Sequence, residues 1–247
     1  MMYESFAYVY DYLMDEAPYE QWKKWIITKM TEYSSGQKIL DLACGTGEIS
    51  VRLAREGFEV TGIDLSEDML TVAQQKAFEA GLQISFFQMD MRELSGFEDQ
   101  FDSVIICCDS LNYLLAEEDV FKALKSVYRQ LKPGGILLFD IHTLYKVNER
   151  FAGHTFADNG KDVSYIWNSF HGKEAGSVDH EISFFIRQND CYERYDELHQ
   201  QRTYPLERYK KWLMDAQFQL LEVTADFTEN KPEDFTERAF FVAKKPS

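Results

Sequence analysis

Residues 39–50 read ILDLACGTGEIS. The apolar start of this segment predicts a buried strand, which is followed by a Gly-x-Gly turn and by residues typical of the first turn of a helix. Gly45 and Gly47 allow a tight turn and let a ligand lie against bare main chain, while Asp41 supplies a charge that can meet a cationic group. A doubly wound α/β protein builds a nucleotide site in this order, at the carboxyl end of its first strand.

Two kinds of nucleotide site are disfavoured by the same segment. A phosphate-binding P-loop is excluded because no Lys-Ser/Thr pair follows Gly47. Ser50 occupies the third position of the dinucleotide fingerprint, where Gly or Ala is expected, and this counts against NAD. The turn alone is also compatible with an ordinary strand-to-helix connection, so a nucleotide site has to be supported by other parts of the chain.

The chain divides into a region of alternating strands and helices and a region of different character. Five continuous apolar runs predict strands over residues 38–42, 58–63, 84–88, 101–107 and 136–140. The helix before the fifth strand is expected to close at Lys-Pro-Gly-Gly, residues 132–135. Strands without polar alternation indicate a parallel sheet buried on both faces. Residues 162–201 instead alternate polar and apolar side chains, which predicts a small antiparallel sheet. A helix from Pro205 and two strands over 219–224 and 239–244 follow.

Charge and cysteine content limit the classes of partner. Acidic residues exceed basic ones by 42 − 26 = 16 and no Lys/Arg-rich run stands out, so nucleic acid and anionic membranes are disfavoured. No apolar run reaches membrane-spanning length, and the first residues lack the basic region of a signal peptide. The four cysteines, Cys44, Cys107, Cys108 and Cys191, fit neither a disulfide framework nor a zinc spacing. We therefore expect a cytoplasmic protein with reduced cysteines and no metal.

Acidic residues follow the ends of three further predicted strands. Asp64 ends the second strand, where a carboxylate accepts hydrogen bonds from ribose hydroxyls in dinucleotide folds. Asp90 follows the third strand, and with Met91 beside it can bind an adenine amine and pack on the ring. Residues 109–113 follow the fourth, over the place where a reactive group would lie. Asp64 with Ser66 could equally cap a helix and Asp90 a turn, but four such motifs in order are less expected by chance than one.

With these motifs the chain resembles the class I S-adenosylmethionine-dependent methyltransferases, in particular the small bacterial kind, most strongly over residues 38–140. Residues 41–47 match the first motif of that family, and residues 131–138 and the final strand pair also fit its pattern. The resemblance implies an α/β fold with a doubly wound, seven-stranded, mostly parallel, Rossmann-like sheet whose last strand is antiparallel, together with the small antiparallel β insertion. One departure is Gln217, where the family usually has Gly at a helix end.

The resemblance also implies S-adenosylmethionine as cofactor and assigns its contacts to the strand-end motifs. The backbone of the glycine turn would face the methionine part. Asp64 would bind both ribose hydroxyls and Asp90 the adenine amine, with apolar neighbours of each near the adenine ring. Asp109 and Ser110 would line the pocket next to the sulfonium. The expected cofactor-binding residues are Asp41, Ala43, Cys44, Gly45, Gly47, Asp64, Leu65, Met69, Asp90, Met91, Asp109 and Ser110.

We expect one domain over residues 1–247, organised in four parts. These are N-terminal lid helices over residues 1–35, the cofactor-binding core over 38–140, an antiparallel insertion over 145–201 that roofs the substrate site, and the last helix with a C-terminal strand pair over 205–247. The aromatic residues that resemble the lid helix of the family are Tyr3, Phe6, Tyr8, Tyr10 and Tyr12.

The predicted reaction is methyl transfer to a nitrogen or oxygen of a small-molecule acceptor by in-line displacement. The protein then has to orient the partners and exclude water, and a base is needed only if the acceptor is a protonated amine or a hydroxyl. Candidates for catalysis are His142, Tyr113 and Tyr10, and the same three could contact the substrate, as could Trp167 and, for an anionic substrate, Arg202. His142 is also typical of a satisfied structural histidine, and Trp167 of strand packing.

Other functions stay open at this point. One is a module that binds S-adenosylmethionine or its demethylated product without catalysis. Another is an enzyme that makes a modified S-adenosylmethionine for tRNA modification, and a third is a nicotinamide-dependent oxidoreductase. The oligomeric state, a homodimer included, is open as well.

Overall fold

A seven-stranded sheet forms the centre of the fold. The computed structural model describes residues 6–14, 16–34, 36–97 and 100–247. The strand order is β10-β11-β5-β4-β1-β2-β3. Every pairing is parallel except those of β11, which runs antiparallel to both of its neighbours. The strands are β1 (Lys38–Leu42), β2 (Glu59–Asp64), β3 (Ser85–Gln88), β4 (Phe101–Ile106), β5 (Leu131–His142), β10 (Gln219–Ala225) and β11 (Arg238–Lys244). The α/β class and the single antiparallel strand predicted from the sequence are confirmed.

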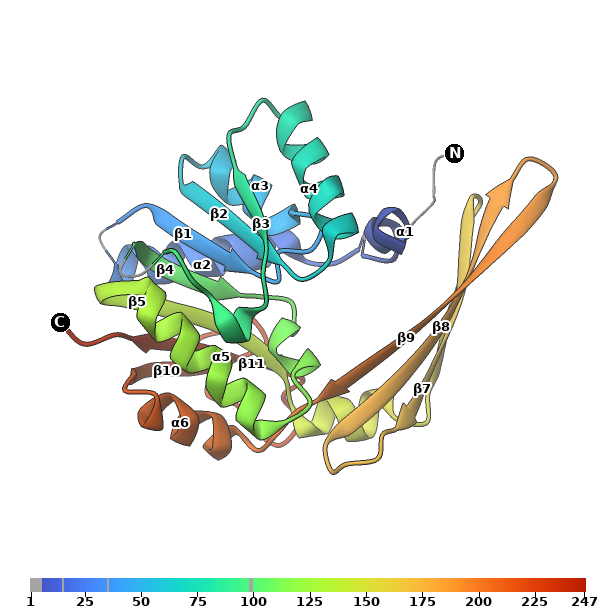
Figure 1. Cartoon of the computed structure of the whole chain (residues 1–247). Helices are drawn as coiled ribbons and strands as arrows, with labels where there is room; N and C mark the ends of the chain where they lie inside the picture. Colours follow the sequence, from blue (N-terminus) through green and yellow to red (C-terminus); the bar gives the residue numbers. More distant parts are fainter. Residues whose placement is uncertain (1–5, 15, 35, 98–99) are drawn as a thin grey trace.

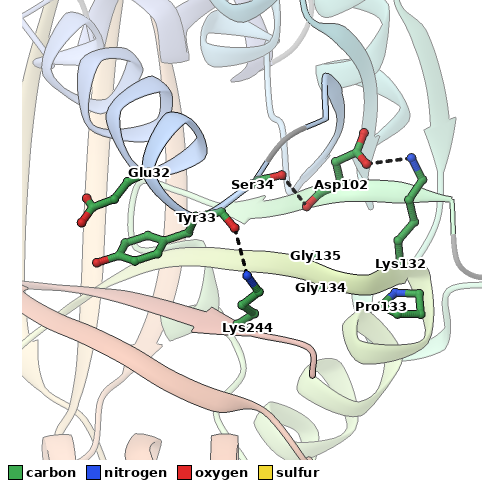
Figure 2. A pocket seen from close by; sticks show the side chains of 9 residues that line it. All are labelled: Glu32, Tyr33, Ser34, Asp102, Lys132, Pro133, Gly134, Gly135 and Lys244. Carbon is green, nitrogen blue, oxygen red and sulfur yellow. Dashed lines mark hydrogen bonds and ion pairs between the residues drawn. The ribbon is translucent and has the colours of Figure 1, made fainter. Parts of the chain in front are cut away.

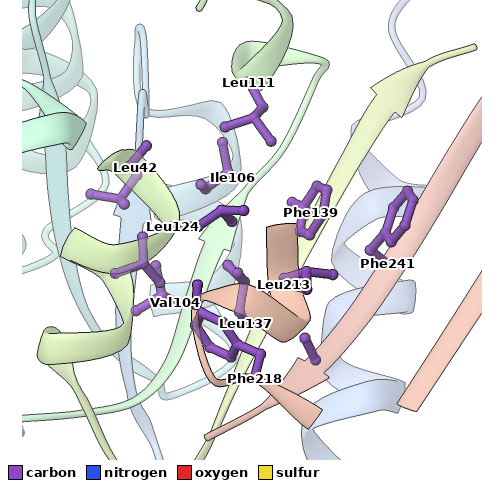
Figure 3. Close-up of a cluster of buried hydrophobic side chains, with 14 of the residues drawn as sticks. Leu42, Val104, Ile106, Leu111, Leu124, Leu137, Phe139, Leu213, Phe218 and Phe241 are labelled. Atoms are coloured by element: carbon purple, nitrogen blue, oxygen red, sulfur yellow. The ribbon is translucent and has the colours of Figure 1, made fainter. Parts of the chain in front are cut away.

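Helices cover both faces of this sheet because its strands are apolar on both sides. In β5, Leu137 and Phe139 point to one face, and Leu138 points to the other. Figure 3 shows the first cluster, where Leu124 and Leu213 pack against that face. The helices on the first face are α5 (Glu117–Gln130) and α6 (Leu206–Asp215), and those on the second are α2 (Tyr19–Tyr33) and α3 (Glu48–Arg55). The central strands are therefore buried as their continuous apolar runs predict, but the edge strand β3 is not, because three of its four residues are exposed.

A second, antiparallel sheet is inserted between β5 and α6. Its order is β6-β7-β8-β9, and Figure 1 shows the long strands β8 and β9 reaching away from the core as an arm. The strands are β6 (Thr155–Asn159), β7 (Val163–His171), β8 (Ser177–Gln188) and β9 (Cys191–Arg202). Its buried face holds Ile182 and Phe184, which cluster with Val9 of α1 (Phe6–Leu13). The short helix α1 thus packs on the arm.

Three details differ from the sequence-based expectation or extend it. Within the region over 145–201 expected to form the insertion, a π-helical turn η3 (Lys146–Phe151) and the strand β6 come before residue 162, where the alternating pattern predicts the antiparallel sheet to begin. Residues 132–135 do not form a separate loop, because β5 already starts at Leu131, which pairs with Phe101 before the register shifts. Gly134 has φ 79°, and a side chain at Gly135 would lie 2.9 Å from the Lys132 carbonyl oxygen, so this irregular start of the strand requires both glycines.

The predicted lid helix is described only in part. Tyr3 and the side chains of Phe6 and Tyr8 lie outside the described residues. Gln217 adopts a left-handed φ of 70°, which explains why glycine suits this helix end better. Of the helices in the described ranges, none has both the length and the apolar content needed to cross a bilayer.

Candidate cofactor and acceptor site

The glycine turn after β1 is a tight loop that begins α3. The Cys44 amide donates to the Ile63 carbonyl at 3.0 Å, and the Gly47 amide donates to the Cys44 carbonyl at 2.9 Å. Gly45 and Gly47 both have positive φ, at 53° and 78°. A Cβ on Gly47 would also lie 2.9 Å from the Ala73 Cβ of α4 (Glu67–Glu79). Both glycines are therefore required by the backbone, as the sequence predicted.

A cavity of about 560 Å³ lies at the carboxyl ends of β1, β2, β3 and β4. The predicted residues that line it are Tyr10, Ala43, Gly45, Asp64, Leu65, Met69, Asp90, Met91, Ser110 and Tyr113. A smaller cavity of about 40 Å³ adjoins it and is lined by Asp41 and Cys44. Four residues line both cavities: Tyr10, Ala43, Gly45 and Ser110. We call the two cavities the large lobe and the small lobe of one site.

Asp64 lies at the rim of the large lobe and also holds the surrounding loops. Its Oδ2 accepts a hydrogen bond from the Gly45 amide at 2.8 Å, and its Oδ1 accepts one from the Ser66 amide at 2.9 Å. Ser66 in turn caps α4, with its hydroxyl oxygen accepting from the Met69 amide. The capping role and the cavity position are therefore both realised at this strand end.

Asp90 combines a capping role with an ion pair. Its carboxylate accepts from the Arg92 amide at 2.9 Å and from the Arg92 guanidinium, whose Nη1 also donates to Asp119 at 2.9 Å. The hydrogen bond from Arg92 lowers the pKa of Asp90 despite partial burial, so this carboxylate stays charged. Two carboxylates thus neutralise the one arginine of the large lobe.

Asp41 lies beneath the small lobe and is only 2% exposed. Burial raises the pKa of its carboxyl group to about 7, against the opposing effect of a hydrogen bond from Ser50 Oγ at 2.6 Å. The full negative charge expected from the sequence is therefore only partly present near neutral pH. Ser50, which departs from the dinucleotide fingerprint, has a structural role as the partner of this aspartate.

The structure places Asp109 behind the wall of the site. Cys108 and Ser110 line the small lobe, but the intervening Asp109 lines neither lobe. Its carboxylate accepts hydrogen bonds from Gln201 Nε2 at 2.8 Å and Arg238 Nη2 at 2.9 Å, and lies 3.2 Å from His142 Nε2. Burial opposes its ionisation, but His142 and Arg238 outweigh that effect and hold the pKa of Asp109 well below its usual range.

Sequence reasoning missed the buried partners of this network. Asp140 is fully buried and accepts from Trp22 Nε1 at 2.8 Å, from the Cys108 amide at 2.9 Å and from the Arg238 guanidinium. Cys108 and Asp109 both have positive φ, at 57° and 54°, so Asp140 holds a strained turn. The signal was present in the sequence, because Asp140 ends one strand expected to be buried and Arg238 directly precedes another.

The remaining predicted side chains divide between the site and its surroundings. His142 is 5% exposed, packs on Phe151 and lines neither lobe, and burial lowers its pKa. Trp167 donates to His180 Nδ1 at 2.9 Å within the insertion, away from both lobes. Arg202 donates to the backbone carbonyls of Leu115 and Ala175 and also lines neither lobe. The structure therefore does not support His142, Trp167 or Arg202 as direct contacts.

Tyr10 and Tyr113 do line the large lobe, and the structure adds His199 of β9. The Tyr113 hydroxyl lies 3.4 Å from His199 Nδ1. Tyr10 lies on α1, next to Asp11, which accepts from Thr46 Oγ1 at 2.6 Å and pairs with Lys76 at 2.6 Å. These contacts hold α1 across the glycine turn. The sequence analysis did not identify His199, because the alternation along a strand predicts which residues share a face but not what that face contacts.

Comparison with known proteins decides the family. A family model described as a methyltransferase domain matches residues 39–135. The chain is 56% identical over 245 residues to the "Putative methyltransferase YqeM" of Bacillus subtilis (strain 168), covering 99% of this chain and 98% of the relative. A crystal structure of a S-adenosylmethionine-dependent methyltransferase from Clostridium acetobutylicum ATCC 824 superimposes with a TM-score of 0.89, at 33% identity and 98% coverage of both chains. The chain belongs to the S-adenosylmethionine-dependent methyltransferases.

More distant relatives of this methyltransferase share the fold or the core alone. The sugar N-methyltransferase KedS8 from Streptoalloteichus sp ATCC 53650 superimposes with a TM-score of 0.79 at 21% identity, covering 97% of this chain and 93% of that structure. The ubiquinone biosynthesis O-methyltransferase of Pseudomonas putida (strain GB-1) is 37% identical over 106 residues, covering 42% of this chain and 44% of that protein. The predicted enzyme class and the predicted cofactor, S-adenosylmethionine, are confirmed.

Proposed function

We propose that this methyltransferase transfers the methyl group to a nitrogen or oxygen atom of a small molecule that carries no phosphate or carboxylate. The observation that carries this proposal is the chemistry of the large lobe. Of the described residues that line it, Arg92 is the one with a permanently cationic side chain, and Asp90 and Asp119 already pair with it. An anionic acceptor would therefore have no positive partner in this lobe.

We assign the adenosyl half of the cofactor and the acceptor to the large lobe, and the methionyl half to the backbone around the small lobe. The large lobe offers Asp64 for the ribose, and Asp90 with Met91 for the adenine. The small lobe offers bare backbone at Gly45, where an added Cβ would meet nothing within 4 Å, and Asp41 for a cationic group. When bound, S-adenosylmethionine supplies a methyl group activated by a sulfonium. In this assignment the adenosyl and methionyl halves meet at the junction of the lobes, next to Tyr10 and Ser110, which line both.

The chain itself contributes orientation and exclusion of water. The glycine turn and the strand-end carboxylates fix the bound molecule, while α1 covers the turn through Asp11. The antiparallel insertion closes the large lobe from the opposite side with His199. Holding the two reactants in the orientation of an in-line displacement can supply much of the rate enhancement of such a reaction. The insertion is accordingly the roof that selects the acceptor.

Small-molecule acceptors also fit the relatives, whose names include an N-methyltransferase for sugars and an O-methyltransferase of ubiquinone biosynthesis. The acidic excess of 16 charges makes direct contact with nucleic acid or an anionic membrane unfavourable. A cytoplasmic location stays a prediction from the cysteine content.

The first experiment is calorimetric titration of the purified protein with S-adenosylmethionine, its demethylated product and NADH, after release of any co-purified ligand. We expect binding of the first two and none of NADH. Incubation with uncharged, cationic and anionic metabolites should then give methylated product from the first two classes only. Methylation of phosphorylated acceptors alone would contradict the proposal. Binding without turnover on every class would favour the non-catalytic module.

A further inference from the structure

His199 and Tyr113 form a polar pair in the wall of the large lobe. Tyr113 ends the short helical turn η2 (Ser110–Tyr113) of the core, whereas His199 comes from β9 of the inserted sheet. Their rings lie edge to face, with centroids 6.1 Å apart and planes inclined at 80°. The pair is therefore the point where the core and the roof meet inside the site.

This pair lies close to the junction of the two lobes. Ser110, at the start of η2, lines both lobes, and Tyr113 is three residues later on the same 3₁₀ turn. Three residues of such a turn advance the chain by roughly 6 Å. Tyr10 also lines both lobes, and it shares the wall of the large lobe with Tyr113. A nucleophile between the junction and the pair would thus be within reach of both.

The surroundings of the pair favour its uncharged form. Burial lowers the pKa of His199, and burial together with the negative charge of Asp109 raises the pKa of Tyr113. Another titratable group, His180, lies directly across from His199 on β8, and burial lowers its pKa to about 4. At neutral pH the wall therefore presents a neutral imidazole, which has one nitrogen able to take a proton.

We propose that His199 is the catalytic base of the methyl transfer, with Tyr113 as the positioning residue that fixes its tautomer. The acceptor is then an N–H or O–H nucleophile with a dissociable proton. Its lone pair forms the new bond to the methyl carbon, the electron pair of the carbon–sulfur bond stays on sulfur, and the proton passes to a ring nitrogen of His199 and on to water. This proposal rests on the proposed function.

His142, the histidine expected from the sequence, cannot fill this role. It lines neither lobe, its Nε2 faces Asp109, and its ring packs on Phe151. His180 lines neither lobe either, and its Nδ1 already accepts from Trp167. Among the histidines of the described chain, His199 is the one that lines the site.

The test is a titration of the histidine rings by nuclear magnetic resonance in two complexes of the full chain. S-Adenosylmethionine carries a positive sulfonium and its demethylated product does not, so they differ in charge at one atom. A base next to that atom should have a pKa lower by about 1 unit in the first complex. His154 is exposed and serves as the internal control, and His199→Gln assigns the resonance. Equal pKa values of His199 in both complexes would overturn the proposal.

Tyr113→Phe tests the positioning role separately. The nitrogen shifts of His199 report which ring nitrogen carries the proton, and loss of the hydroxyl should change that tautomer balance while both ligands still bind. An unchanged balance would remove Tyr113 from the proposal. His199→Gln should bind S-adenosylmethionine within about 2-fold of the parent protein, because the base contacts the acceptor rather than the cofactor. If neither ligand binds the parent protein, the proposed function fails instead.

Discussion

The two edges of the central sheet each carry a cavity of about 560 Å³, and only one of them has the chemistry of a site. Figure 2 shows the cavity at the amino ends of the parallel strands, which we call the amino edge. Polar groups that line it form hydrogen bonds and ion pairs with one another. Lys132 pairs with Asp102 at 2.7 Å, and Lys244 donates to the Tyr33 carbonyl at 3.3 Å. At the carboxyl edge, in contrast, Asp64 and a glycine turn face a largely apolar lobe.

The difference follows from the direction of the strands. Parallel strands deliver their loops and the first turns of the following helices to the carboxyl edge, where backbone amides point outward and glycine turns fit. The amino edge receives helix ends and the irregular start of β5, and its charges serve to join these segments. Equal volume at the two edges therefore says less about function than the chemistry of the walls.

The largest effect is expected for the buried ion network of the carboxyl edge. Arg238→Met should lower the free energy of unfolding by about 3–5 kcal/mol, because it leaves Asp109 and Asp140 buried without their cation. Urea denaturation measures this loss. The double variant Arg238→Met/Asp140→Asn should recover part of the lost unfolding free energy, because it removes one of the two unpaired carboxylates. A decrease below about 1 kcal/mol for Arg238→Met alone would show that the network is dispensable.

Asp64→Ala should have the next largest effect, on cofactor affinity. Hydrogen bonds to a charged group contribute about 1.5–3 kcal/mol each, so losing the ribose contacts should weaken binding of S-adenosylmethionine by about 30-fold or more. Asp102→Ala is the matched control at the amino edge and should leave that affinity unchanged in the same calorimetric titration. Equal affinities for both variants would contradict the assignment of the carboxyl edge.

The contrast between the edges also shows what the sequence could predict. The succession of strands and helices along the chain, the glycine turn and the positions of Asp64 and Asp90 at strand ends follow from local patterns, because apolar runs and turn residues act over a few neighbours. They predict a site at the carboxyl edge of the sheet, where the large lobe lies.

Long-range contacts decided the features that sequence reasoning missed. Asp109 turns behind the wall because Arg238, 129 positions later, binds its carboxylate, and no local pattern encodes that pair. His199 enters the site only because the inserted sheet folds back over the core. The sequence predicts a full negative charge at Asp41. The burial that raises its pKa could not be predicted, because it depends on helices packed from elsewhere in the chain.

Two aspartates at opposite edges should respond oppositely to pH. Asp41 has a pKa raised to about 7 by burial, so it holds a proton that the unfolded chain releases near pH 3.9. The unfolding free energy of the protein should therefore fall as pH rises from about 4 to 7, by up to about 4 kcal/mol because each pKa unit corresponds to about 1.4 kcal/mol, and level off above. Asp41→Asn should abolish this slope in urea titrations, and a slope that persists would place its origin elsewhere.

Asp102 has the reverse behaviour. Burial alone would raise its pKa, but hydrogen bonds from Lys132 and the Lys38 amide lower it. The contribution of Asp102 to the unfolding free energy is therefore fully present above the pKa of the unfolded chain and is lost as the pH falls through the folded pKa. Asp102→Asn should flatten only the acidic end of the plot of unfolding free energy against pH.

The smallest effect is expected for Lys132→Met at the amino edge. The Lys132 side chain is 39% exposed, so water screens its pair with Asp102, and Asp102 keeps the amide of Lys38 as a second partner. Loss of the pair should cost about 0–1 kcal/mol of unfolding free energy, against several times more for Arg238→Met. Affinity for S-adenosylmethionine should not change, because this cavity contacts none of the strand-end residues. A clear drop in that affinity would instead make the amino-edge cavity a second functional region, coupled to the first through the strands between them.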